Sequence, residues 1–229
     1  MLTINEAIEK RHSVRSYGDR KIEEDIRRQL DESIRIYNQQ SGLHMRMVYD
    51  EPKGFNSALA HYGHFENVRN YLIIASAKDG DYLEKAGYYG EKVVLLAQQL
   101  GLNSCWVALT FNKRRVKKML DKGEQLIIVV ALGYGNNDGH AHKNRDINAL
   151  ADLSAEDPQW YCDGIEAALK APTAINQQKF HFSREGNVVD LQTVGIGTNL
   201  KLDKGIVRCH FEIGAGPENF SWKTDSLIK

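Results

Sequence analysis

The feature that most constrains the fold of this 229-residue chain is a long helical stretch with almost no polar face. Residues 82–100 contain the run VVLLAQQL, which is apolar almost all round, so the helix is expected to be enclosed by other elements. Gly101 follows as the expected C-terminal cap. The apolar runs YLIIA (71–75) and QLIIVVAL (125–132) are typical of strands buried on both faces. These segments indicate a layered fold around a central helix.

The rest of the chain alternates between helical and strand patterns. Thr3 and Glu6 fit a capping box at the start of an N-terminal helix. Apolar residues at steps of three or four predict a helix at residues 22–37, and further helices are predicted at residues 116–120, 160–170 and 205–214. Short strands are predicted at residues 45–49, 179–183 and 188–191, and a surface loop at 50–63. This mixture predicts an α+β, or mixed α/β, fold class.

The charge balance excludes several kinds of partner. Thirty basic and thirty acidic residues cancel, so no net field recruits nucleic acid or an anionic membrane. The longest apolar run, Leu126 to Leu132, is too short to cross a bilayer, and the N-terminus lacks the apolar core of a signal peptide. Three scattered cysteines do not resemble a disulfide framework. We expect a cytoplasmic protein in which any anion site is local.

Two basic segments are candidates for such an anion site. Arg11-His12-Ser13-Val14-Arg15 offers two guanidinium groups and a hydroxyl, which suit a phosphate. The alternative is a solvated basic helix end, which composition alone favours. Lys143 and Arg145 follow a buried strand, where α/β proteins gather their ligands. Taken alone, this second pair is more often part of a solvated loop.

Other reactive side chains give weaker signals. His61 with His64 and His140 with His142 have metal-like spacings, but no neighbouring cysteine or carboxylate completes a site. We expect surface histidines and no metal. Cys105 stands beside a tryptophan in an apolar setting and is interpreted as a small buried residue, not a nucleophile.

Four segments in a fixed order carry a resemblance to a known family: RHSVRSY (11–17), LAQQLGLNSCWVALTFN (96–112), GYGNNDGHAHKNR (133–145) and APTAINQQKFHF (171–182). Together they resemble the nitroreductase family. In that family the first segment binds the phosphate of FMN, and the second forms the central helix and the loop over the flavin ring. The third closes the phosphate site, and the fourth, usually Ala-Pro-Ser-x-x-Asn-x-Gln-Pro-Trp, touches the flavin ring and ribityl chain. Here Lys179-Phe180 replaces Pro-Trp, so the ring contact there is expected to differ.

The resemblance implies a nitroreductase-like fold, with a central antiparallel or mixed sheet flanked by helices, and a set of FMN-binding residues. These are Arg11, His12, Ser13, Arg15, Leu109, Thr110, Lys143, Arg145, Pro172, Thr173 and Asn176. It also implies an oxidoreductase that takes electrons from NAD(P)H and passes them to a nitroaromatic, a quinone or a similar acceptor. Because the flavin performs the redox chemistry, no catalytic side chain is assigned. The alternative is a non-catalytic flavin-binding carrier, sensor or scaffold.

The position of the Ala-Pro element departs from the family pattern. It lies in the second half, while the early position holds YNQQSGLHMRMVYD. Asn38-Gln39-Gln40 resembles Asn176-Gln177-Gln178, and residues 88–106 align with residues 203–222, which suggests an internal duplication. We interpret the chain as a pseudo-dimer, in which residues 1–150 and a shortened second half, 151–229, form one FMN-binding unit. A monomer is favoured, and a homodimer is the alternative.

Overall fold

The computed structural model describes residues 1–57, 60, 62–225 and 227, and these residues form two compact units. Unit 1 contains Met1–Tyr82 and Val93–Ala141, whereas unit 2 contains Leu83–Lys92 and His142–Lys229. Helix α4 (Leu83–Gln99) therefore contributes to both units. The division into domains at residue 150 stays a prediction.

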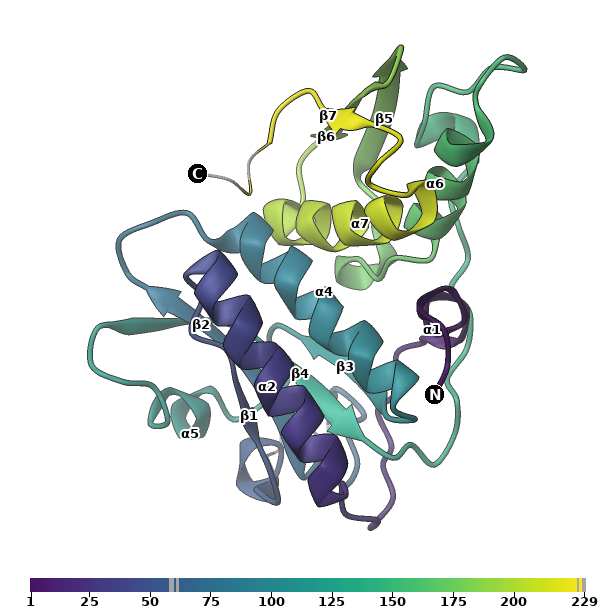
Figure 1. The fold of residues 1–229 in the computed structure, drawn as a ribbon. Helices are drawn as coiled ribbons and strands as arrows, with labels where there is room; N and C mark the ends of the chain where they lie inside the picture. The colour runs from purple at the N-terminus through teal and green to yellow at the C-terminus, as the bar shows by residue number, and fades with distance from the viewer. Residues whose placement is uncertain (58–59, 61, 226, 228–229) are drawn as a thin grey trace. The chain divides into compact units, whose positions relative to one another are not determined.

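The sheet of unit 1 has four strands in the order β1-β2-β4-β3 (Figure 1). These are β1 (Arg46–Val48), β2 (Asn70–Ala77), β4 (Glu124–Gly133) and β3 (Asn103–Val107), and every neighbouring pair is antiparallel. The apolar runs YLIIA and QLIIVVAL lie in β2 and β4, the two inner strands. The run in β2 is buried on both faces, as the sequence pattern predicts, whereas β4 is buried on both faces only from Ile128 onward.

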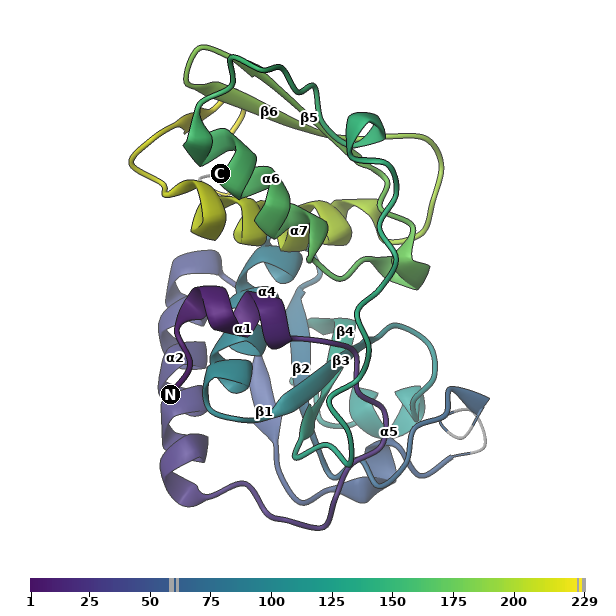
Figure 2. The ribbon, with the colours of Figure 1, turned by 90° about the vertical axis from the view of Figure 1, so that its right-hand side faces the viewer.

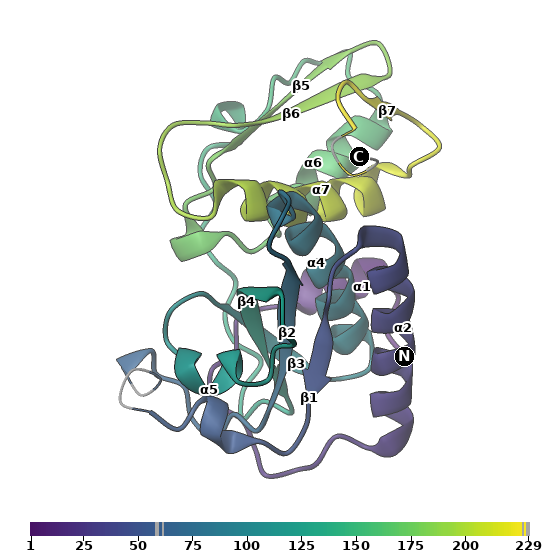
Figure 3. The same ribbon diagram turned by 90° about the vertical axis from the view of Figure 1, so that its left-hand side faces the viewer.

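Both faces of this sheet are covered within unit 1. Helix α2 (Glu24–Ser41) and the second part of α4 lie on one face, and α5 (Lys113–Lys117) lies on the other (Figures 2 and 3). Because strand side chains alternate, Tyr71 and Ile73 point to the α5 side, where they join a core cluster. That cluster includes Phe55, Phe65, Val107, Phe111, Val116 and Val129.

The first helix, α1 (Ile4–Lys10), begins with the predicted capping box. The Glu6 amide donates to Thr3 Oγ1 at 3.2 Å, and the Thr3 amide donates to Glu6 Oε2 at 2.8 Å. The helix ends at Arg11, whose backbone is extended (φ −70°, ψ 112°). Arg11 therefore starts an extended segment instead of a further helical turn.

Unit 2 has a three-stranded sheet in the order β5-β6-β7. β5 (Phe180–Glu185) and β6 (Val188–Thr193) are antiparallel, and β7 (Ser221–Trp222) is parallel to β6. Helices α6 (Gln159–Leu169) and α7 (Leu200–Ala215) complete the unit. Phe182 of β5 stacks on Phe211 of α7 with ring centroids 4.8 Å apart, so aromatic rings join the sheet to the helix.

Two glycines allow the first part of α4 to approach α7 closely in unit 2. A Cβ atom at Gly87 would lie 2.0 Å from the Leu202 carbonyl oxygen, and one at Gly205 would lie 2.0 Å from the Glu84 carbonyl oxygen. No real side chain fits such a distance. One turn further along, Glu91 and His210 are fully buried, and Glu91 Oε1 lies 2.9 Å from His210 Nε2.

The α+β class and the antiparallel and mixed sheets are confirmed, but some boundaries are wrong. Strands β3 and β7 were not predicted, and α5 spans 113–117 instead of 116–120 because Asn112 caps it by accepting from the Arg115 amide at 3.0 Å. The predicted loop at 50–63 contains a short 3-10 helix at Pro52–Gly54, and residues 58, 59 and 61 lie outside the described residues. Among the described residues, no helix is long and apolar enough to span a membrane.

Candidate functional site

The basic cluster of unit 1 is an extended segment fixed to the edge of the sheet. Ser13 forms a parallel bridge with Ser104 of β3, and the Val14 amide donates to the Ser104 carbonyl at 2.9 Å. Val14 is only 1% exposed and anchors the segment in the core. Because side chains alternate along extended backbone, residues 11, 13 and 15 share one side, and residues 12 and 14 share the other.

A glycine in the turn after β4 packs against the second of these sides. Gly139 has a left-handed backbone (φ +72°), and a Cβ there would lie 2.8 Å from His12 Cβ and 3.3 Å from Val14 Cγ2. The GYGNNDG turn therefore needs glycine at this position both for its backbone angle and for its close approach to the segment. His12 faces this turn, and its predicted role in FMN binding stays a prediction.

The other three side chains all influence the thiol of Cys105. Burial raises the pKa of the Cys105 thiol, whereas the charge of Arg15, a hydrogen bond with Ser13 and the charge of Arg11 act in the opposite direction. Two guanidinium groups and a hydroxyl therefore act on the same buried side chain of β3. Cys105 itself is only 3% exposed, which confirms its interpretation as a small buried residue.

The two arginines differ in exposure. Arg11 is 3% exposed, so its guanidinium lies in a setting where water screens charge poorly. Arg15 is exposed, and its guanidinium carbon lies 6.0 Å from the centre of the Phe65 ring. The pair thus offers one desolvated and one accessible positive charge. This arrangement does not match a solvated helix end, the reading that composition favours for the cluster.

The remaining predicted residues of unit 1 lie in the loop after β3. Leu109 is 74% exposed and Thr110 is half-buried. A Cβ at Gly63 would lie 2.5 Å from Thr110 Cβ, so the segment around Gly63 packs on this loop. The loop is held at its far end by the Asn112 amide, which donates to the Gly54 carbonyl at 2.7 Å.

In unit 2 the structure brings the two predicted segments together. Asn176 Nδ2 donates to the Lys143 carbonyl at 2.8 Å, and Arg145 Nη1 donates to the Gln178 carbonyl at 3.0 Å. The loop that carries Lys143 and Arg145 is therefore fastened to the loop that carries Pro172, Thr173 and Asn176.

Gln178, which the sequence did not single out, is the main link between these loops. It is fully buried, and its Oε1 accepts from the Arg145 amide at 2.7 Å while its Nε2 donates to Asn144 Oδ1 at 3.0 Å. Its own amide donates to Thr173 Oγ1 at 3.0 Å. The Asn-x-Gln pattern was the available signal, since the family element contains the same glutamine.

The backbone of this loop is strained. Ile175, Asn176 and Gln178 all have left-handed angles, with φ of 48°, 54° and 42°. Such angles cost about 1–3 kcal/mol each for residues other than glycine, and they persist only where surrounding contacts impose them. The side chain of Ile175 is 93% exposed, so burial of this residue does not offset its strain.

Asp203, at the start of α7, supplies some of those contacts. Its carboxylate accepts from the Ala174 amide at 3.1 Å and from Gln177 Nε2 at 2.7 Å. Asp203 is 6% exposed, and burial raises its pKa to about 6, although both hydrogen bonds act in the opposite direction. The loop is therefore held by a carboxyl group whose ionisation is disfavoured by burial.

The raised pKa predicts how stability depends on pH. In the native state Asp203 keeps its proton up to about pH 6, whereas in the unfolded state it releases the proton near the ordinary pKa of 3.8. Protonation of Asp203 therefore stabilises the folded protein fully below about pH 4, and this stabilisation is lost as the pH rises through 6. A shift of this size corresponds to about 2 kcal/mol once residual solvent is allowed for. Urea unfolding of wild type and Asp203→Asn at pH 4 and pH 7.5 measures it. We expect the difference in unfolding free energy between the two proteins to change by about that amount, and an equal difference at both pH values contradicts the prediction.

A family model described as "Putative TM nitroreductase" matches residues 3–215, almost the whole chain. The chain belongs to this nitroreductase family. A search of curated proteins found no match. Membership of the family supports an oxidoreductase, and it confirms the resemblance carried by the four sequence segments.

Solved structures of nitroreductase-type proteins share the fold. A protein described as a nitroreductase from Thermotoga maritima is 21% identical, with a TM-score of 0.64 over 95% of this chain and 85% of that one. A nitroreductase from Desulfovibrio desulfuricans, solved with FMN, is 19% identical (TM-score 0.53; 69% and 98% covered). A protein from Bacteroides thetaiotaomicron described as an NADH dehydrogenase or NAD(P)H nitroreductase is 16% identical (TM-score 0.51; 66% and 96% covered).

The histidines considered as metal ligands do not form a site in the described part of the chain. There, no three or more His, Cys, Asp or Glu side chains are placed to hold a metal ion. His61 lies outside the described residues. His142 Nε2 instead lies 2.9 Å from the Leu169 carbonyl oxygen, which gives this side chain a structural role in unit 2.

Proposed function

We propose that this protein is an FMN-dependent oxidoreductase that passes electrons from NAD(P)H to a small electrophilic acceptor such as a nitroaromatic or a quinone. The observation that carries the proposal is the pairing of the segment with β3, which brings Arg11, Ser13 and Arg15 to act on one thiol of that strand. The family match and the FMN in the Desulfovibrio desulfuricans relative support the choice of cofactor.

The donor set fits a phosphate monoester. Arg11 would hold the phosphate by a charge-assisted hydrogen bond in a setting with little water, which makes that contact strong. Ser13 would donate through its hydroxyl, and the exposed Arg15 would add a second positive charge from the solvent side. When bound, FMN would supply the transfer of a hydride or of single electrons.

Residues of unit 2 belong to the proposal through the family resemblance. Lys143 and Arg145 are assigned to the phosphate, and Pro172, Thr173 and Asn176 to the flavin ring and ribityl chain. Leu109 and Thr110 of unit 1 are assigned to the flavin N5 edge. Gln178 and Asp203 would act by positioning, because their hydrogen bonds hold the strained loop that carries Asn176.

The test of this function begins with the colour of the purified protein and a titration of the apoprotein with FMN. Bleaching of the bound flavin by NADH or NADPH under nitrogen, followed by reoxidation with a quinone or a nitroaromatic, would establish turnover. A yellow protein whose flavin neither a nicotinamide nor a protein electron carrier reduces favours a flavin-binding carrier, sensor or scaffold. A protein that does not bind FMN contradicts both functions.

The oligomeric state is part of the same proposal. We propose that one chain binds one FMN as a monomer, because the Ala-Pro element is carried in the same chain as the phosphate-binding segments. Light scattering combined with flavin quantitation tests this. One flavin per particle of 25.9 kDa is the expected result, and a dimer that loses FMN on dissociation contradicts it.

A further inference from the structure

A basic surface on unit 1 has no role in the function proposed above. Helix α5 and its C-terminal cap carry four exposed cations, Lys113, Arg114, Lys117 and Lys118, here called the basic patch. Lys117 and Lys118 follow Arg114 by three and four positions and so lie on its face of the helix, while Val116 is fully buried on the opposite side.

Nearby carboxylates do not neutralise the basic patch, because they are engaged elsewhere. Glu51 pairs with Arg115 at 3.2 Å, and Asp121 pairs with Arg46 at 3.4 Å. Glu124 also pairs with Arg46. Since the whole chain has a net charge of zero, the basic patch is a local positive field on an otherwise balanced protein.

Two exposed apolar side chains belong to the loop that precedes α5 and to a segment that packs on this loop. Leu109, 74% exposed, is four residues before Lys113, and Tyr62 is 81% exposed. Gly63, which follows Tyr62, packs against Thr110, which follows Leu109. An apolar centre with a charged rim is the usual composition of a protein–protein interface, and the charges set its partner and its association rate.

We propose that Tyr62, Leu109 and the basic patch form a docking surface for an acidic one-electron carrier protein that reduces the flavin. The proposal rests on the proposed function, since Leu109 and Thr110 are assigned to the flavin N5 edge. A carrier docked there would meet the loop over the flavin directly. Two reduced carriers, each losing one electron, and two protons from solvent reduce one FMN by two electrons. An acidic protein is favoured over nucleic acid because the surface centre is apolar and the chain is neutral overall.

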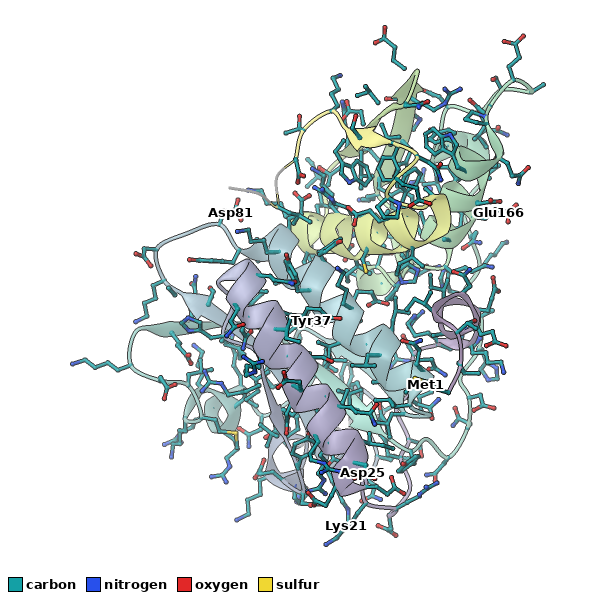
Figure 4. All side chains as sticks on the ribbon, viewed as in Figure 1. Met1, Lys21, Asp25, Tyr37, Asp81 and Glu166 are labelled. Carbon is teal, nitrogen blue, oxygen red and sulfur yellow. The ribbon has the colours of Figure 1, made fainter. Side chains whose placement is uncertain are left out.

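The test compares the FMN-loaded wild type with the double variant Lys117→Glu/Lys118→Glu. A matched control, Lys21→Glu/Lys78→Glu, makes the same charge change at exposed positions of unit 1 outside the basic patch (Figure 4 labels Lys21). The probe is a chemically reduced, acidic plant-type [2Fe–2S] ferredoxin, mixed anaerobically with each protein. Flavin reduction is followed by absorbance at several salt concentrations, and binding of the oxidised probe to the flavin-free proteins is measured separately.

We expect the rate constant for wild type and for the control to fall steeply with salt, because screening weakens charge steering. At low salt the Lys117→Glu/Lys118→Glu variant should be reduced at least about tenfold more slowly, with unchanged FMN affinity and unchanged reduction by dithionite. Equal rates for all three proteins overturn the proposal. So does tight binding of duplex DNA that only the patch variant loses while its reduction by ferredoxin is unaffected.

Failure of the cofactor assignment is distinguishable from failure of the docking surface. If the protein does not bind FMN, the titration shows it before any carrier is added. Salt-sensitive binding of ferredoxin to the flavin-free wild type, lost in the patch variant, then still supports the docking surface. Absence of that binding overturns it.

Discussion

Replacement of Arg11 by alanine is expected to weaken FMN binding by about ten- to a hundredfold. Arg11 is almost fully buried and acts on the same thiol as Ser13 and Arg15, so its loss would remove the proposed charge-assisted contact with phosphate in a poorly solvated setting. Such a contact contributes about 1.5–3 kcal/mol, which corresponds to that change in dissociation constant. Fluorescence titration of the apoprotein with FMN measures it.

Arg15→Ala separates loss of binding from loss of folding. Arg15 is exposed, so its replacement should leave the melting temperature unchanged while FMN affinity falls. Arg28→Ala removes an exposed arginine of α2 that pairs with Asp25, and it is the matched control, with no expected effect on FMN. Unchanged dissociation constants for Arg11→Ala and Arg15→Ala together would show that the basic segment does not bind the phosphate.

Replacement of Gly205 by valine is expected to destabilise the protein strongly. A Cβ at this position would lie 2.0 Å from the Glu84 carbonyl oxygen, and backbone cannot move aside as a flexible side chain does. Forcing atoms into a packed core costs about 3 kcal/mol at the upper end of the usual range. For a chain of this size the melting temperature should fall by about 6–12 °C, measured by circular dichroism.

The direction of the stability change in the smaller substitution Gly205→Ala tests the same contact. Glycine to alanine inside an exposed helix normally stabilises by about 0.5–1 kcal/mol, but Gly205→Ala should destabilise. Lys201→Ala, at an exposed position of the same helix, is the control and should leave the melting temperature almost unchanged. A melting temperature of Gly205→Ala equal to or above that of wild type would contradict the close approach of α4 and α7.

Elements that depend only on residues close together in the sequence were predictable. The capping box of Thr3 and Glu6 needs only residues three apart, and the inner strands β2 and β4 are continuous apolar runs. Strand β3 was missed because its five residues include two polar ones and no long apolar run. It becomes a strand by pairing with β4.

The tripeptide Asn-Gln-Gln shows the limit of local sequence more clearly. Residues 38–40 lie inside helix α2, whereas residues 176–178 form a strained loop after α6. Their match is therefore not a match of structure. Residues 88–106 and 203–222 both run through a helix into a strand that carries a tryptophan. The duplication itself stays a prediction.

For the candidate site, the sequence indicated only charged and hydroxyl side chains in two short segments, and their binding of a phosphate stays a prediction. Gln178 and Asp203 were missed because their importance comes from burial and from partners supplied by other segments. Glycine spacing likewise does not reveal that Gly87 and Gly205 lie at one helix crossing.

The extended backbone between Arg11 and Arg15 also limits which evolutionary changes this site tolerates. Inserting or deleting a single residue there would exchange the two sides, turning one arginine toward the turn at Gly139 and an apolar side chain toward the proposed phosphate site. Changes of residue type at position 12 would leave this alternation intact. Among relatives that retain the site, we therefore expect insertions and deletions to fall outside this segment, with the two arginines always four positions apart.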